Sequence, residues 1–182
     1  EKGDIVLCRY NAPLVSAFYQ LIGSGKSAYI LGKDLTKGLV NSVKKISKDM
    51  SMSTQEFAEL LDADFEYRYR KLIDNEKFTQ ANNLEDKHEC LCLFVYRAQT
   101  VGEMVQEIER VFNSDGKGDI MLSTVHKAKG LEANNVFILA TERMPHPKAV
   151  NMKEEMNICY VAITRAKKNL HYCGPRPSNG GR

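Results

Sequence analysis

The sequence predicts an α/β fold in which a mainly parallel sheet is flanked by helices and interrupted by a small helical insertion. Two short apolar runs, Ile120–Leu122 and Val136–Ala140, are separated by a polar linker that contains no Asn-Gly turn. Such runs are typical of buried strands in a parallel sheet. The length of 182 residues suits one α/β domain of ordinary size with a small insertion.

The N-terminal part is expected to alternate strand, helix and strand. Asp4–Cys8 is a short apolar strand, and Asn11 is a suitable N-cap for a helix that ends at Gly23. Ala28–Leu31 is apolar and predicts the next strand.

The segment GSGKS, residues 23–27, shares part of its pattern with a phosphate-binding P-loop. That motif needs a glycine at position 20, which is Gln20, and it runs from a strand into a helix. Here a predicted helix precedes the segment and a predicted strand follows it. We therefore interpret the segment as a loop and do not assign Lys26 to ATP phosphates.

The middle of the chain is expected to be helical. One helix starts at Asp34 or Thr36 and runs to about Lys48, and Ser53 with Glu56 forms a capping box for the next. Two further helices are expected over Ala81–Gln99 and Val101–Phe112, although ECLCLFVYR within the first of them also has strand propensity. We expect a loop at 113–116 and frayed structure over the Pro/Gly/Ser-rich residues 175–182.

Composition excludes some classes of protein. No apolar run approaches the roughly 20 residues that span a bilayer, so we expect no membrane partner. The five cysteines show no C-x-x-C spacing, and we interpret them as reduced thiols of a cytoplasmic protein that holds no metal. Because the chain starts at Glu1 and not at methionine, we expect it to be a segment of a longer protein.

Charge is distributed unevenly along the chain. Residues 1–50 hold 8 basic and 4 acidic side chains, residues 116–182 hold 11 and 5, and residues 51–115 hold 7 and 14. The basic ends suit an anionic partner such as a nucleotide or DNA, although ordinary surface charge also accounts for them. The acidic middle is not expected to lie on DNA.

Three segments resemble motifs of superfamily 1 helicases of the UvrD/Rep/PcrA type. The segment TVHKAKGLE, from Thr124 to Glu132, resembles motif V, whose pattern is T-x-H-x-A-K-G-L-E. Ala133 follows it, where an aromatic residue is common. EEMNICYVAITRA, from Glu154 to Ala166, resembles motif VI, and IVLCRYNAPL, from Ile5 to Leu14, resembles motif IV. The three occur in the family's order.

The resemblance implies the second RecA-like domain, called 2A, of an ATP-dependent DNA helicase. Its first part would be residues 1–48 and its second part residues 116–174. Residues 49–115 would be a helical insertion where the family has a much larger domain called 2B, either as a reduced, all-helical remnant of 2B or because the chain belongs to a short branch of the family. Residues 175–182 would be a flexible tail. DNA repair is the process that such a resemblance suggests.

The resemblance also implies roles for particular residues. Arg9 and Arg165 would be catalytic arginines that converge on ATP held by an N-terminal RecA-like domain of the same polypeptide. Planar guanidinium groups suit this role because they donate paired hydrogen bonds to phosphate oxygens. Glu132 would accept a hydrogen bond from a ribose hydroxyl of the nucleotide. Gly130 would allow a backbone conformation or a close approach that other residues do not permit. Magnesium would be held mainly by the other domain.

Thr124, His126 and Lys127 are expected to contact the backbone of single-stranded DNA, and the expected partners are single-stranded and duplex DNA. Bland interpretations remain for several residues: a salt bridge for Arg9, a cation at a helix C-terminus for Arg165, and a structural role for His126. Tyr160 is interpreted as a packing residue and His146 as a loop residue.

Motifs for binding the ATP phosphates, the Walker A lysine and the Walker B acidic pair, do not occur in this sequence. We therefore expect this chain alone neither to hydrolyse ATP nor to unwind DNA. The alternative hypothesis is a non-catalytic nucleic-acid-binding module derived from a helicase.

Overall fold

The fold is described from a computed structural model that covers residues 2–112, 117–146, 149 and 151–174. The predicted loop at 113–116 and the predicted tail at 175–182 lie outside these residues. Among the described residues, no helix has both the length and the apolar character needed to cross a membrane.

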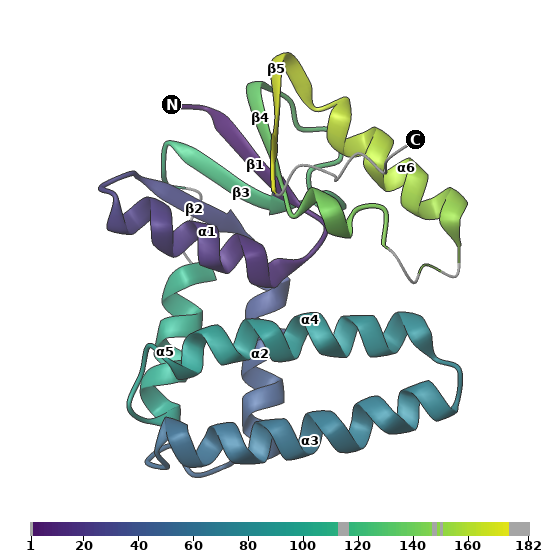
Figure 1. Ribbon diagram of the computed structural model, residues 1–182. Helices are drawn as coiled ribbons and strands as arrows, with labels where there is room; N and C mark the ends of the chain where they lie inside the picture. Colours follow the sequence, from purple (N-terminus) through teal and green to yellow (C-terminus); the bar gives the residue numbers. More distant parts are fainter. Residues whose placement is uncertain (1, 113–116, 147–148, 150, 175–182) are drawn as a thin grey trace.

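A five-stranded parallel sheet forms the upper layer, as the sequence predicted (Figure 1). Its strand order is β2-β3-β1-β4-β5. The strands are β1 (Asp4–Cys8), β2 (Ala28–Leu31), β3 (Ile120–Thr124), β4 (Ala133–Leu139) and β5 (Ala166–Cys173). Strand β1 lies at the centre, and its five residues are all buried.

The helices lie on both faces of the sheet and in a lower layer (Figure 1). They are α1 (Asn11–Gly23), α2 (Lys33–Ile46), α3 (Thr54–Asp74), α4 (Phe78–Val95), α5 (Val101–Phe112) and α6 (Met152–Ile163), with a short 3-10 helix at Thr141–Arg143. The segment ECLCLFVYR is helical up to Val95. Helix α4 begins and ends a few residues before the predicted bounds, Ala81 and Gln99.

Side chains of the central strand alternate between two hydrophobic clusters because successive strand residues point to opposite faces. Val6 and Cys8 pack with α1 and with the helices of the lower layer. Ile5 and Leu7 pack on the opposite face with the motif V segment and with α6. Each of these clusters thus joins segments that are far apart in the sequence.

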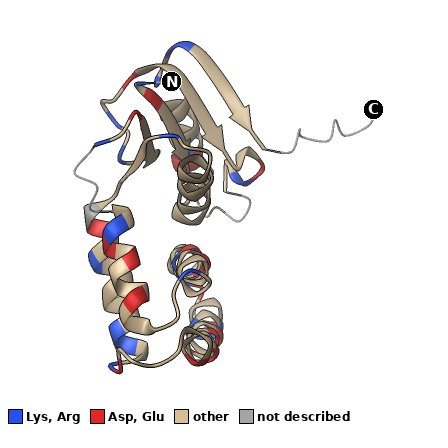
Figure 2. Ribbon diagram, turned by 90° about the vertical axis from the view of Figure 1, so that its left-hand side faces the viewer, with Lys and Arg blue, Asp and Glu red and all other residues tan. Residues whose placement is uncertain are grey.

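The lower helices share the first cluster with the sheet. Phe57 of α3, Phe94 of α4 and Phe112 of α5 are fully or almost fully buried in it. Figure 2 shows both acidic and basic segments along these helices. The helical segment predicted as an insertion therefore packs directly beneath the RecA-like part. Its helix α4 contacts α1, and its helix α5 contacts α2 and β2.

Several local predictions can be compared with the structure. Ser53 caps α3 by accepting a hydrogen bond from the Glu56 N–H, as expected. Residues 23–27 join α1 to β2, which agrees with rejecting a P-loop. Arg165 was predicted to lie on a helix, and this was wrong. Helix α6 ends at Ile163, and Arg165 lies in the turn before β5.

Candidate functional site

Arg9 and Thr124 lie next to each other at the carboxyl edge of the sheet. Strands β1 and β3 are parallel and pair Cys8 with Thr124, so the residues that follow both strands emerge at the same edge. Arg9, Thr124, His126 and Lys127 line a cleft of about 500 Å³ at this edge, which we call the carboxyl-edge cleft. Four of the seven predicted site residues are therefore brought together.

A salt bridge holds Arg9 against the first turn of α6. Its Nη2 donates to Oε1 of Glu155 at 2.9 Å, and its Nε lies 3.3 Å from both carboxylate oxygens. The Glu155 side chain is only 8% exposed, against 23% for Arg9. The bland interpretation of Arg9, a salt bridge, thus describes its contacts in this structure.

Glu155 remains charged because it has a second donor. The His146 backbone N–H donates to its Oε2 at 3.1 Å. Burial alone would raise the pKa of Glu155, but hydrogen bonds from Arg9 and His146 outweigh burial and lower it. The sequence interpretation of His146 as a loop residue is thus incomplete, because it is buried and lines the cleft.

His126 lies at the exposed rim of the cleft. Partial burial, and then the positive charge of Arg9, lower the pKa of His126. The imidazole is therefore predominantly neutral at pH 7 in the folded chain. An anion in the cleft would reverse the effect of Arg9 and favour the protonated ring.

Asp86 of α4 closes the other side of the cleft. Its carboxylate accepts from the backbone N–H groups of Asn11 and Ala12 at 2.8 and 3.1 Å and from Asn11 Nδ2 at 2.6 Å. These N–H groups begin α1 and have no partner within that helix. Asn11 was expected to cap α1 with its own side chain, but the helix starts at Asn11 and Asp86 supplies the acceptor. Sequence reasoning did not find Asp86.

The remaining predicted residues form a second group at the amino edge of the sheet. Strands β4 and β5 pair Ala133 with Ala166 there, which places Glu132 and Arg165 next to the same edge. The Arg165 guanidinium donates to the carbonyl oxygens of Val161 and Leu131 at 2.9 and 3.1 Å and to Thr164 Oγ1 at 3.0 Å.

Glu132 and Gly130 are both exposed or partly exposed in this second group. Glu132 lies 3.3 Å from Lys167, and both side chains are at least half exposed. Gly130 has φ +87°, and a Cβ there would meet no atom within 4 Å. Its requirement is therefore a left-handed backbone and not close packing.

The structure does not bring Arg9 and Arg165 together. Arg9 contacts the start of α6, and Arg165 follows its end. A 12-residue helix is about 18 Å long at the usual rise per residue. The two guanidinium groups therefore lie at opposite ends of α6, each with its own hydrogen-bond acceptors.

Between the two groups, α6 presents an apolar stripe to solvent. Met152, Met156, Tyr160 and Ile163 are 49%, 54%, 69% and 43% exposed and recur at helical spacing. Tyr160 was expected to pack in the core or in the cleft, but it is largely exposed and does not line the cleft. Met144, Cys159 and Tyr172 join two of these residues in an adjoining apolar groove of about 480 Å³. Exposed apolar surface of this extent is typical of an interaction site.

The chain is similar to a known family of domains and to several known proteins. The sequence profile of the UvrD-like helicase C-terminal domain matches residues 33–173. The ATP-dependent DNA helicase PcrA of Bacillus subtilis strain 168 is 30% identical over 140 residues, which are 71% of this chain and 19% of that protein. The proteins of the same name in Staphylococcus aureus strain COL and Staphylococcus epidermidis strain RP62A are each 44% identical over 66 residues, or 32% of this chain and 9% of theirs. The chain thus spans about a fifth of the length of the Bacillus relative.

Proposed function

Since the chain belongs to the family of UvrD-like helicase C-terminal domains, we propose that it is the second RecA-like motor domain of an ATP-dependent DNA helicase. In this proposal, residues 1–48 and 116–174 form the motor domain and residues 49–115 its helical insertion. ATP and magnesium are bound mainly by an N-terminal RecA-like domain of the same polypeptide. The observation that carries the proposal is that Arg9, Thr124, His126 and Lys127 follow β1 and β3 at one edge of a parallel sheet.

Arg9 and Arg165 act on the ATP that the N-terminal domain presents. The carboxyl-edge cleft alone does not suit a complete nucleotide, because Asp86, Glu154 and Glu155 line it together with Arg9. It does suit a phosphate group brought by another surface, since Arg9 can exchange its bond to Glu155 for one to a phosphate oxygen.

Glu132 and Gly130 belong to the nucleotide contacts at the amino edge. Glu132 is half exposed and paired with an exposed lysine, so its carboxylate is available to a ribose hydroxyl. Thr124, His126 and Lys127 contact single-stranded DNA, because a hydroxyl, an imidazole and an ammonium group can all bind phosphate without reading bases. The exposed stripe on α6 suits contact with the N-terminal domain.

The test is ATP hydrolysis by the longer polypeptide. Arg9→Ala and Arg165→Ala should each lower the turnover number by 100-fold or more, since one arginine finger can supply about 10³-fold or more. Lys168→Ala is the matched control, because Lys168 is exposed beside Arg165 and has no assigned role. The chain of 182 residues should by itself show no hydrolysis. Near wild-type turnover for both arginine variants would reject the finger assignment.

The alternative is a non-catalytic module that binds nucleic acid. The neutral, exposed His126 and the adjacent Lys127 favour it as much as they favour the motor. A longer polypeptide that binds single-stranded DNA but neither binds nor hydrolyses ATP would establish the alternative.

A further inference from the structure

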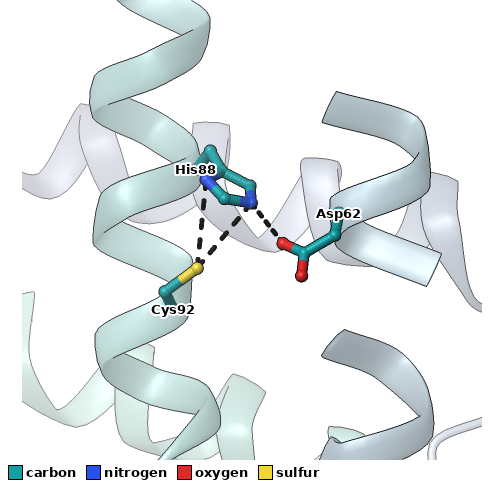
Figure 3. A group of neighbouring side chains, drawn as sticks. All are labelled: Asp62, His88 and Cys92. Carbon is teal, nitrogen blue, oxygen red and sulfur yellow. Dashed lines mark hydrogen bonds and ion pairs between the residues drawn. The ribbon is translucent and has the colours of Figure 1, made fainter. Parts of the chain in front are cut away.

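A second polar group lies outside the cleft, between α3 and α4 of the lower layer (Figure 3). Asp62 comes from α3, and His88 and Cys92 come from α4. One potential ligand atom of each residue lies within 4.8 Å of the other two. His88 Nε2 is 2.7 Å from Asp62 Oδ1 and 3.8 Å from Cys92 Sγ.

The helices place these side chains for simple geometric reasons. His88 and Cys92 are four residues apart and therefore lie on one face of α4. Helix α3 packs along this face and supplies Asp62 from the opposite side (Figure 3). Phe65 stacks on the His88 ring, with centroids 4.2 Å apart and planes 22° apart, and so restricts the ring. The site is open to solvent, because the Asp62 side chain is 66% exposed.

We propose that Asp62, His88 and Cys92 bind a Zn²⁺ ion, with water as the fourth ligand. Thiolate sulfur, imidazole nitrogen and carboxylate oxygen are the three kinds of ligand that zinc prefers, and three protein ligands with one open position is a common arrangement. Tetrahedral bonds of the usual lengths separate N from O by about 3.3 Å and S from N by about 3.6 Å. The observed 2.7 and 3.8 Å differ from these by about 0.6 Å or less. Cys92 Sγ also lies 3.9 Å from His88 Nδ1, so the thiol faces both ring nitrogens in this structure and would turn toward the Nε2 side when the ion binds.

Binding requires that the ligands lose their protons. His88 would coordinate through Nε2, with its proton on Nδ1, and the bond to Asp62 would be replaced by two bonds to the ion. Zinc must displace the thiol proton, so that its affinity falls as the pH is lowered.

The ion would join α3 to α4 and fix the helical segment as one unit. Sequence reasoning did not find this site, because Asp62 lies 26 residues before His88 and 30 before Cys92, and the cysteines lack C-x-x-C spacing. The competing explanation is a hydrogen bond between Asp62 and His88 beside an uninvolved thiol. The experiment below separates the two, and its outcome does not depend on the helicase proposal.

The probe is Co²⁺, which replaces zinc and gives a sulfur-to-metal charge-transfer band when bound to thiolate. The chain is first freed of metal with a chelator and then titrated. The expected result is saturation at one ion per chain, loss of the band on adding Zn²⁺, and a rise in Tm of about 5 to 10 °C with zinc at 100 times its Kd. The band should be absent in Cys92→Ser. In Asp62→Asn the affinity for Co²⁺ should be at least 10-fold weaker.

Cys173→Ser is the matched control, since Cys173 is a partly exposed free thiol on β5, far from the three ligands in sequence. It should keep both the band and the rise in Tm. The proposal is overturned if Co²⁺ at stoichiometric amounts produces no band, if Cys92→Ser produces the same band, or if zinc raises the Tm of all variants equally.

Discussion

Arg9 offers the sharpest test, because it holds a buried carboxylate in this structure and is also the proposed finger. Arg9→Met keeps most of the aliphatic stem but removes the guanidinium. Glu155 would then retain only the His146 N–H as a donor. A buried acid with one donor is costly, because its remaining oxygen loses both water and its partner.

The expected loss follows from the burial of the pair. Removing one partner of a fully buried pair costs about 3–5 kcal/mol. Because Arg9 is 23% exposed, the pair is not fully buried, and we expect a loss of about 2–3 kcal/mol. For a chain of this size, that loss lowers the Tm by about 5–10 °C.

The assay is urea unfolding followed by circular dichroism, for the single variants and for Arg9→Met combined with Glu155→Gln. Glutamine still accepts from His146 but carries no charge, so the double variant should recover about 1.5 kcal/mol or more over Arg9→Met. Arg68→Met is the control, since Arg68 pairs with Asp64 on the exposed face of α3 and should cost no more than about 0.5 kcal/mol.

Two results would refute this reasoning about Arg9. One is a loss below about 0.5 kcal/mol for Arg9→Met, and the other is no recovery in the double variant. In the longer polypeptide the same pair of variants separates two roles. If Arg9 is a finger, the double variant regains stability but not ATP hydrolysis.

Two further predictions concern the same cleft. Asp86→Ala should destabilise the chain by about 2–3 kcal/mol in urea unfolding, because it leaves the first N–H groups of α1 without an acceptor, whereas Asp74→Ala at the exposed end of α3 should change little. The lowered pKa of His126 predicts that folding stability declines as the pH falls below about 6.5, and that a bound phosphate raises this pKa again. Binding of single-stranded DNA, measured by fluorescence anisotropy, should therefore tighten by up to roughly tenfold per pH unit from pH 8 to 6. His126→Gln should abolish that pH dependence, whereas the control Lys129→Gln, at a nearby exposed position, should keep it.

Periodicity and capping signals predicted most of the fold. The five buried residues of β1, the end of α1 at Gly23 and the Ser53 cap of α3 all follow from neighbouring residues in the sequence. Local patterns suffice there because strand alternation and helix capping involve residues only a few positions apart. Four of the five parallel strands could be predicted because they are short apolar runs, whereas β5 was missed because its sequence AKKNLHYC is polar and mostly exposed.

Features that depend on distant contacts could not be predicted in this way. Asp86 caps a helix that begins 75 residues earlier, and its own helix shows only an ordinary acidic position. Glu155 is buried by its bonds to Arg9 and His146, although a glutamate in the first turn of a helix is usually exposed. Arg165 was assigned to α6 by extending the apolar period past Ile163, where the chain turns into β5.

The separation of Arg9 from Arg165 bears on how the proposed motor would close. Helix α6 connects the carboxyl-edge cleft with the second group, and its exposed stripe lies between them. A partner domain that docks along this stripe would therefore meet both guanidinium groups in one step, although they lie far apart in the isolated chain. Because Tyr160 and Met156 do not support the core, Met156→Asp should leave folding intact and still weaken that docking. On this argument α6 sets the spacing of the two arginines, and both meet the partner domain only when that domain lies along the helix.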